Sequence, residues 1–139
     1  MQPYVVSDIL NPDGSVLQHH DPVCRRRVIR EETSAVMREM MEAVVLYGGG
    51  RNAQIQGYRV GGKSGTSQKL DSADEKARIA SFVAVAPIDD PQFLCLVCLD
   101  EPHSWTTSGG ALSGPVCAEV LKKALPYLGV EPENNAGTS

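Results

Sequence analysis

Two apolar runs joined by a short polar link constrain this chain more than any other feature. The runs are residues 79–86 (IASFVAVA) and 93–99 (FLCLVCL), and residues 87–92 (PIDDPQ) join them. A parallel pair of strands needs a crossover of about a dozen or more residues, so this link predicts an antiparallel hairpin. Because both runs are apolar at nearly every position, we expect the sheet to be covered on both faces.

Two segments with helical periodicity precede and follow this hairpin. Residues 31–47 begin with glutamates, which the helix dipole favours in a first turn, and three glycines from Gly48 end the segment. A last helix is expected to begin at Pro115, because proline is favoured at the first helical position. Residues 103–114 are expected to form a loop before it. The first helix has an apolar stripe, expected to lie in the core with its methionines as filler: Val36, Met37, Met40, Met41 and Val44.

The remaining segments complete an α+β pattern. Residues 4–9 and 15–18 are short apolar stretches around residues 11–14 (NPDG), which have strong turn chemistry, so a small hairpin is expected there. Polar residues 19–22 are expected to end it, and the polar stretch 68–78 reads as a loop. The order of hairpin, helix, strand, antiparallel hairpin and helix predicts an antiparallel sheet packed with helices. A length of 139 residues allows one domain.

Charge and composition argue against several classes of partner. The chain has 13 Lys and Arg, 17 Asp and Glu, and a net charge of −4. Nucleic acid and anionic membrane surfaces need a positive face on the protein, so neither is expected as a partner. The run from Arg25 to Arg27 fits a solvated strand face. No apolar run approaches the roughly 18 residues of a membrane-spanning helix, and the sequence as written opens with no signal-peptide pattern.

The cysteines do not form a recognisable metal site. Cys95 and Cys98 have CxxC spacing but lie inside a strand-like run. Residues i and i+3 of a strand point to opposite faces, so the two thiols cannot hold one metal ion. Neither Cys24 nor Cys117 completes a second ligand pair of the usual spacing. We therefore expect no metal and no cofactor, and interpret the cysteines as small buried hydrophobes.

One loop carries two competing motifs. Residues 57–64 (GYRVGGKS) match the P-loop pattern GxxxxGK[ST], and Asp100 follows an apolar strand as a Walker B acid would. A P-loop, however, needs a buried strand before it and a helix starting at its Lys-Ser pair. Residues 52–56 are polar, and residues 65–68 (GTSQ) are poor helix formers. The apolar strands also belong to an antiparallel hairpin, which disfavours a nucleotide fold.

The other motif is Lys63, Ser64, Gly65 and Thr66, which contains a K-[ST]-G box of the kind found in β-lactamases and penicillin-binding proteins. Around this K-S-G-T segment the chain resembles the C-terminal half of a class B penicillin-binding protein transpeptidase domain, of the division and sporulation type. The resemblance implies a serine β-lactamase-like fold, with residues 1–130 as the domain portion. Because Gly129 is expected to end the last helix, residues 131–139 are expected to form a flexible tail. The resemblance rests on five segments in matching order: PYVVSDILNPDGSVL, REETSAVMREMMEAVV, GYRVGGKSGTSQK, ARIASFVAVAPIDDPQFLCLVCLDEP and GGALSGPVCAEVLKKALPYLGV.

The resemblance implies roles for the K-S-G-T segment on a strand that lines the active site. Lys63 would place positive charge toward the substrate carboxylate, and Ser64, where the family usually has Thr, would donate a hydrogen bond to it. Gly65 would let the acyl donor lie against the strand as an added β-strand. The backbone N–H of Thr66 would be one donor of the oxyanion hole. The implied ligands are a peptidoglycan stem peptide or a β-lactam in the complete domain.

Two further family boxes are missing from the sequence. No lysine has a serine three residues before it, and there is no Ser-x-Asn triplet. Thr66 and Lys69 have the spacing, but Thr66 already belongs to the K-S-G-T segment. The nucleophile and its base are therefore absent. We interpret the chain as a piece of a longer enzyme, inactive alone, whose parent is membrane-anchored with an extracytoplasmic domain.

Two consequences and two alternatives follow from this interpretation. Without the missing half of the domain, apolar surface should be exposed, so we expect self-association or binding to that half. One alternative is a non-catalytic module that makes protein contacts in a cell-wall assembly. The other is a P-loop nucleotide binder. An upstream Ser-x-x-Lys would separate the enzyme from the module, and magnesium-dependent nucleotide binding would support the P-loop.

Overall fold

The computed structural model describes residues 1–133, which fall into two compact units, residues 1–33 and residues 34–133. The expected flexible tail, residues 131–139, falls mostly outside the described residues. Its first three residues belong to no helix or strand, and the N–H of Glu133 donates to the carbonyl oxygen of Gly57 at 2.7 Å. Among the described residues, no helix combines the length and the apolar character needed to cross a membrane.

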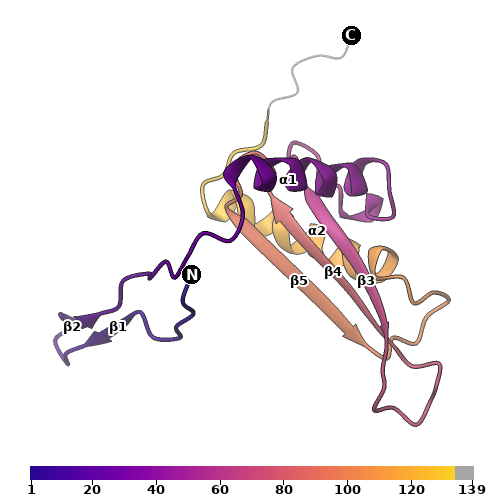
Figure 1. Cartoon of the computed structure of the whole chain (residues 1–139), viewed down its shortest axis with the longest axis horizontal. Helices are drawn as coiled ribbons and strands as arrows, with labels where there is room; N and C mark the ends of the chain where they lie inside the picture. The colour runs from indigo at the N-terminus through magenta and orange to yellow at the C-terminus, as the bar shows by residue number, and fades with distance from the viewer. Residues whose placement is uncertain (134–139) are drawn as a thin grey trace. The chain divides into compact units, whose positions relative to one another are not determined.

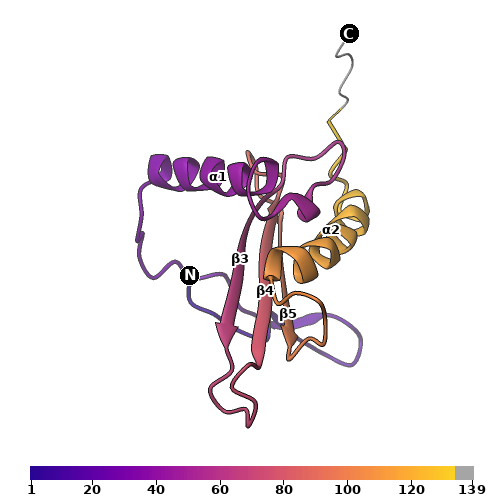
Figure 2. The ribbon, with the colours of Figure 1, turned by 90° about the vertical axis from the view of Figure 1, so that its right-hand side faces the viewer.

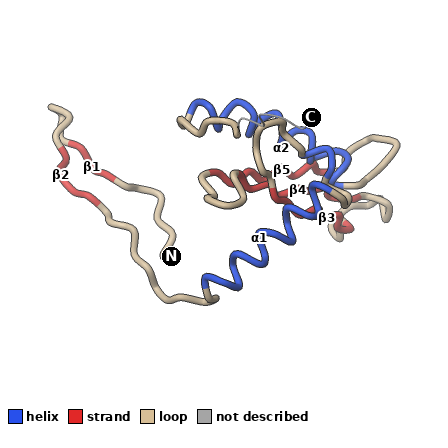
Figure 3. Tube along the Cα trace, turned by 90° about the horizontal axis from the view of Figure 1, so that it is seen from above, coloured by secondary structure: helices blue, strands red, loops and turns tan. Residues whose placement is uncertain are grey.

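The first unit contains a two-stranded antiparallel hairpin (Figure 3), in which β1 (Asp8–Leu10) pairs with β2 (Val16–His19). The expected hairpin is confirmed, with its turn at the predicted place, where the N–H of Gly14 donates to the carbonyl of Asn11 at 2.9 Å. Gly14 has φ +84°, a conformation that only glycine adopts readily. The strands are displaced from their expected bounds, because residues 4–7 stay outside β1 and His19 belongs to β2.

The second unit is built on a three-stranded antiparallel sheet in the order β3-β4-β5 (Figure 1). Its strands are β3 (Gly61–Gln68), β4 (Arg78–Ala86) and β5 (Phe93–Asp100). The predicted antiparallel hairpin of apolar strands is confirmed by the register of β4 against β5. The prediction of a loop over residues 68–78 is wrong at both ends, because Gln68 and Arg78 form the last pair of the β3–β4 ladder.

One helix, α2 (Gly109–Tyr127), packs across one face of this sheet (Figure 2). Phe82 of β4 and Leu121 and Leu125 of α2 are fully buried between the layers. The hydroxyl of Ser113 is also fully buried and donates to the carbonyl of Ala80 at 2.9 Å, so this polar group is satisfied inside the core. The fold is therefore the α+β arrangement that the sequence predicts.

The expected start of α2 at Pro115 is wrong, because the helix begins six residues earlier and Pro115 lies inside it. The residue before the helix, Ser108, makes no side-chain capping bond. Instead, the N–H of Gly109 donates to the hydroxyl oxygen of Thr66 in β3. A helix amide is thus satisfied by a distant strand, a partner that the capping patterns of the local sequence do not identify.

The other helix, α1 (Glu31–Leu46), matches its predicted range to within one residue. Its apolar stripe does not all lie in the core as expected. Val36, Met37 and Met40 are 48%, 50% and 57% exposed, and the buried residue of the helix, Val45, is not part of the predicted stripe. Within the second unit only the C-terminal part of α1 is packed, for example where Met41 approaches Gly61. A short 3₁₀ helix, η1 (Arg51–Ala53), follows and buries Ala53.

The sheet face opposite α2 is open in the second unit. Leu94 and Leu96 of β5 are 64% and 61% exposed on that face, whereas Cys95 between them is buried on the α2 side. The expectation of cover on both faces does not hold for the described residues, since α2 covers only one. The exposed apolar surface expected from an incomplete domain is present on the other.

Candidate functional site

The K-S-G-T segment lies on β3, at an edge of the sheet. Among residues 1–133, no other strand pairs with its outer side. The N–H of Lys69 donates to the carbonyl of Ala77 at 3.0 Å, one step beyond the β3–β4 ladder. Because an antiparallel ladder alternates strictly, odd-numbered residues of β3 bond to β4. The N–H and C=O groups of Ser64 and Thr66 therefore point to the outer edge.

The side chains of the segment divide between the two faces of the sheet. Ser64 is opposite Phe82 and Thr66 is opposite Ala80, so both are on the face that α2 covers. Lys63 is opposite Val83 on the other face. Its side chain nevertheless reaches the outer edge of β3, where the ammonium group donates to the carbonyl oxygen of Ser64 at 2.6 Å. The edge thus carries a positive charge beside the outward N–H of Thr66.

Thr66 also joins β3 to the beginning of α2. Its hydroxyl donates to the carbonyl oxygen of Thr107 at 3.2 Å and accepts from the N–H of Gly109 at 3.3 Å. Sequence reasoning missed this junction and placed Gly109 in a loop. The pair of glycines at the start of α2 was the available signal, because close backbone packing excludes a side chain there.

The backbone around Ser64 decides between the two motifs. Residues 61–68 form one continuous strand, and no helix begins at Lys63 or Ser64. A P-loop holds phosphate on the N-terminus of a helix that starts at this point, and the arrangement around β3 does not provide it. The neighbouring strands are antiparallel, as predicted for an extended edge and not for a nucleotide-binding sheet.

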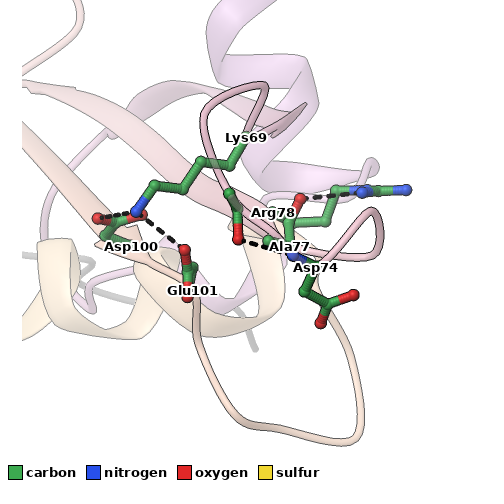
Figure 4. Close-up of polar contacts among 7 residues, drawn as sticks. Lys69, Asp74, Ala77, Arg78, Asp100 and Glu101 are labelled. Atoms are coloured by element: carbon green, nitrogen blue, oxygen red, sulfur yellow. Dashed lines mark hydrogen bonds and ion pairs between the residues drawn. The ribbon is translucent and has the colours of Figure 1, made fainter.

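A lysine just beyond the segment forms a small charged cluster, shown in Figure 4. The Lys69 ammonium lies 2.8 Å from Asp100 and 2.9 Å from Glu101, and its side chain is 21% exposed. Hydrogen bonds to Asp100 and then to Glu101 raise the pKa of Lys69 above its ordinary value. Sequence reasoning assigned Asp100 to a possible Walker B strand and missed its pairing with Lys69.

Cys95 and Cys98 lie on opposite faces of β5, as their spacing predicts. Cys95 is buried and Cys98 is exposed on the other face of β5. Cys117 is buried in α2, and burial, followed by the neighbouring Cys95, raises the pKa of its thiol to about 12. Cys24 is exposed, so the interpretation of all four cysteines as buried is wrong for Cys24 and Cys98. In the described part of the chain, no group of three His, Cys, Asp or Glu side chains is arranged to hold a metal ion.

Comparisons with known proteins all indicate one family. The family described as "Penicillin binding protein transpeptidase domain" matches residues 1–122. Stage V sporulation protein D of Bacillus subtilis is 38% identical over 136 residues, which is 96% of this chain and 21% of that protein. The peptidoglycan D,D-transpeptidase FtsI of Escherichia coli is 34% identical over 122 residues, 86% of this chain and 21% of that protein. The chain spans about a fifth of the length of these relatives.

Solved structures give the same result. The D,D-transpeptidase domain of a peptidoglycan glycosyltransferase from Eggerthella lenta superposes with a TM-score of 0.78 at 28% identity, covering 94% of this chain and 28% of that one. The transpeptidase domain of penicillin-binding protein 3 from Burkholderia pseudomallei has a TM-score of 0.69 at 41% identity, covering 78% and 34%. From the matched family, the relatives and the superposed folds together, the chain belongs to the penicillin-binding protein transpeptidase family.

Proposed function

We propose that this chain supplies one side of the acyl-transfer site of a peptidoglycan transpeptidase, which binds a stem peptide or a β-lactam. The observation that carries the proposal is the outer edge of β3, where the N–H of Thr66 points outward and the Lys63 ammonium lies beside it. An edge strand with outward amides binds an extended peptide by adding it to the sheet.

Each residue of the K-S-G-T segment has a role in this proposal. Lys63 attracts the carboxylate of the acyl donor, and the Ser64 hydroxyl donates a hydrogen bond to it. Gly65 leaves space for the donor along the strand. The N–H of Thr66 stabilises the negative charge that develops on the carbonyl oxygen during acyl transfer, a contribution of about 3–4 kcal/mol for one such donor.

The nucleophile and its base come from elsewhere in this proposal. The sequence contains no Ser-x-x-Lys and no Ser-x-Asn, so the 139 residues alone cannot form a serine ester by the family's chemistry. We propose that the remaining part of a transpeptidase domain supplies these groups and that the complete protein is membrane-anchored with this domain outside the cytoplasm.

The exposed apolar surface supports a need for a partner. Leu94 and Leu96 on the open sheet face and Met37 and Met40 on α1 are each at least half exposed. Apolar surface of this kind marks an interaction site. The proposed partner is the remaining part of the transpeptidase domain, and a second copy of the chain takes its place when that part is absent.

A chimera tests the proposed function. The matching segment of Stage V sporulation protein D from Bacillus subtilis is replaced by this chain, and a fluorescent penicillin is used to label the product. We expect covalent labelling of the chimera and none of the purified 139-residue chain. Lys63→Met is expected to slow labelling of the chimera by about a hundredfold or more, the effect of losing one electrostatic group at such a site.

Controls separate this result from a folding failure. Lys122→Met removes an exposed lysine from α2 and should leave labelling unchanged, and Ser64→Thr restores the usual family residue and should keep it. A chimera that folds, as judged by circular dichroism, but is never labelled would favour the non-catalytic interaction module. Covalent labelling of the 139-residue chain that is lost on a Ser→Ala change would overturn the proposal that it is inactive alone.

A further inference from the structure

The β5–α2 connection, residues 101–108, is attached at one end to β3 and at the other to Lys69, the first residue after β3. β5 and β3 are the two outer strands of the sheet, so this segment must cross the end of β4 to reach the start of α2. Its first end is held by Lys69 and its last end by Thr66. The two anchoring residues are three positions apart: Thr66 belongs to β3, and Lys69 is the first residue after that strand.

The anchor at Lys69 consists of two ion pairs. Its ammonium lies between the carboxylates of Asp100 and Glu101, at 2.8 and 2.9 Å (Figure 4). Glu101 has φ +48°, a left-handed conformation that is unfavourable for a residue with a side chain. An ion pair and the hydrogen bond from its N–H to the carbonyl of Arg78, at 3.0 Å, hold this residue in place. These two contacts of Glu101 fix the direction in which the chain leaves β5.

Among residues 1–133, Arg78 makes no ion pair with Asp100 or Glu101. Arg78 donates to the carbonyl oxygens of Glu75 and Ala77. Lys69 is also fixed through its backbone, whose N–H donates to the carbonyl of Ala77 at 3.0 Å. Lys69 is therefore held both through its backbone and through its ammonium group.

The Thr66 anchor depends on where the connection ends. The hydroxyl of Thr66 is held between the carbonyl of Thr107, in the last part of the connection, and the N–H of Gly109, directly after it. Loss of either contact would let the Thr66 side chain rotate. The orientation of its peptide group at the outer edge would then be less constrained.

We propose that Lys69 is a positioning residue for the acyl-transfer site: through Asp100 and Glu101 it holds the β5–α2 connection in the path that anchors Thr66. The inference rests on the proposed function for the role of the Thr66 N–H, but the coupling between Lys69 and the connection is independent of any reaction. Lys69 itself does not contact substrate in this proposal.

The 139-residue chain provides two direct probes of the coupling. Its single tryptophan, Trp105, lies in the connection and is 90% exposed, so its fluorescence anisotropy decay reports on the mobility of that segment. The N–H of Gly109 reports on the junction through its hydrogen exchange rate. In Lys69→Met we expect faster depolarisation of Trp105 and exchange of the Gly109 amide about threefold faster or more, the range for loss of an ion-pair network.

Matched variants keep the test specific. Lys76→Met removes a lysine from the same β3–β4 loop and should change neither probe, because its ammonium makes no ion pair among residues 1–133. Asp100→Asn, a change at an exposed side chain, should act in the same direction as Lys69→Met, and Lys69→Arg should preserve both probes. Exchanging the charges, with Lys69→Asp and Asp100→Lys together, should recover part of the protection.

Two results would overturn the inference. One is unchanged Trp105 and Gly109 behaviour in both Lys69→Met and Asp100→Asn. The other is a uniform rise in exchange over the whole sheet in those variants, which would show general destabilisation. Neither result depends on penicillin labelling, so failure of the positioning role and failure of the proposed function are distinguishable.

Discussion

Gly109 lies so close to Ser81 that a side chain at position 109 would overlap the Ser81 carbonyl group. An added Cβ would be 2.9 Å from the Ser81 carbonyl carbon and would also overlap the carbonyl oxygen of Gly65. The obstacles are backbone atoms of two paired strands, which cannot move aside cheaply. The first residue of α2 is therefore required to be glycine so that the helix can start against the K-S-G-T strand.

From this contact we expect Gly109→Ala to lower the free energy of unfolding by about 3 kcal/mol, the upper range for overpacking. Urea unfolding followed by circular dichroism measures it. Gly49→Ala is the matched control, because an added Cβ there meets nothing within 4 Å, and its effect should stay within about 0.5 kcal/mol. Equal effects at both positions would contradict the close packing of α2 on the sheet.

The four cysteines should divide into two pairs by reactivity. Cys24 and Cys98 are exposed, whereas Cys95 and Cys117 are buried, and burial raises the pKa of the Cys117 thiol to about 12. Since the thiolate is the reactive species, iodoacetamide at pH 8 should modify Cys24 and Cys98 in the native chain and all four in urea. Peptide mass spectrometry identifies the sites.

Modification of Cys117 as fast as Cys98 under native conditions would show that α2 does not stay docked on the sheet. Because Cys117 is held over β4 and β5 by contacts with the carbonyls of Phe82 and Cys95, at 3.4 and 3.7 Å, its protection reports on that interface. Leu121→Ala, which leaves a cavity in the same layer, should increase the reactivity of Cys117 selectively.

The sheet was predictable from sequence because its signals are local. The six-residue link 87–92 permits only an antiparallel hairpin, and the CxxC spacing correctly separates Cys95 from Cys98 by face. The resemblance to the transpeptidase family implied that the K-S-G-T segment is a strand, and the poor helix propensity of the residues after Ser64 disfavoured a helix there. The hairpin and the faces of its two cysteines were therefore predicted from local signals, whereas the K-S-G-T strand was predicted from the resemblance.

What sequence reasoning missed depends on contacts between distant segments. α2 starts at Gly109 because Thr66, 43 residues earlier, accepts a hydrogen bond from its first amide, and proline at position 115 offered a stronger local signal. The stripe of α1 was expected to be buried, but periodicity shows only which side chains share a face. Whether a face is covered depends on what packs against it, and Met37 and Met40 remain half exposed.

The hairpin of the first unit should be sensitive to pH through His19 and Asp8. Their side chains are 2.6 Å apart, and this hydrogen bond raises the pKa of His19 above 6.5 and lowers the pKa of Asp8 below 3.8. The contribution of His19 to the stability of the hairpin is complete below pH 6.5 and is lost as the pH rises through the raised pKa of His19. The aspartate contribution is present above pH 3.8 and is lost as the pH falls through the lowered pKa.

The pairing should therefore be strongest between about pH 4 and 6.5, and NMR titration of the His19 ring measures the relevant pKa. Asp8→Asn should return the pKa of His19 toward its ordinary value. Asp21→Asn should have a smaller effect, because Asp21 lies farther away, at 3.5 Å from the other ring nitrogen. An unchanged titration of His19 in Asp8→Asn would show that the two residues do not pair in solution.

Leu96 provides a test of the expected self-association. It is 61% exposed on the open face of β5, and the even-numbered residues of this edge strand turn their N–H and C=O groups outward, since the N–H of Glu101 bonds back to Arg78 of β4. A long apolar edge without a charged residue at its centre favours pairing with another chain. Leu96→Lys places a charge there and should shift sedimentation velocity profiles toward monomer at the same protein concentration.

Leu128→Lys, at a 52% exposed leucine beyond the end of α2, adds the same charge away from the sheet and should leave the profile unchanged. A chain that is monomeric before either change, with cooperative unfolding, would show that the open face of β5 needs no partner.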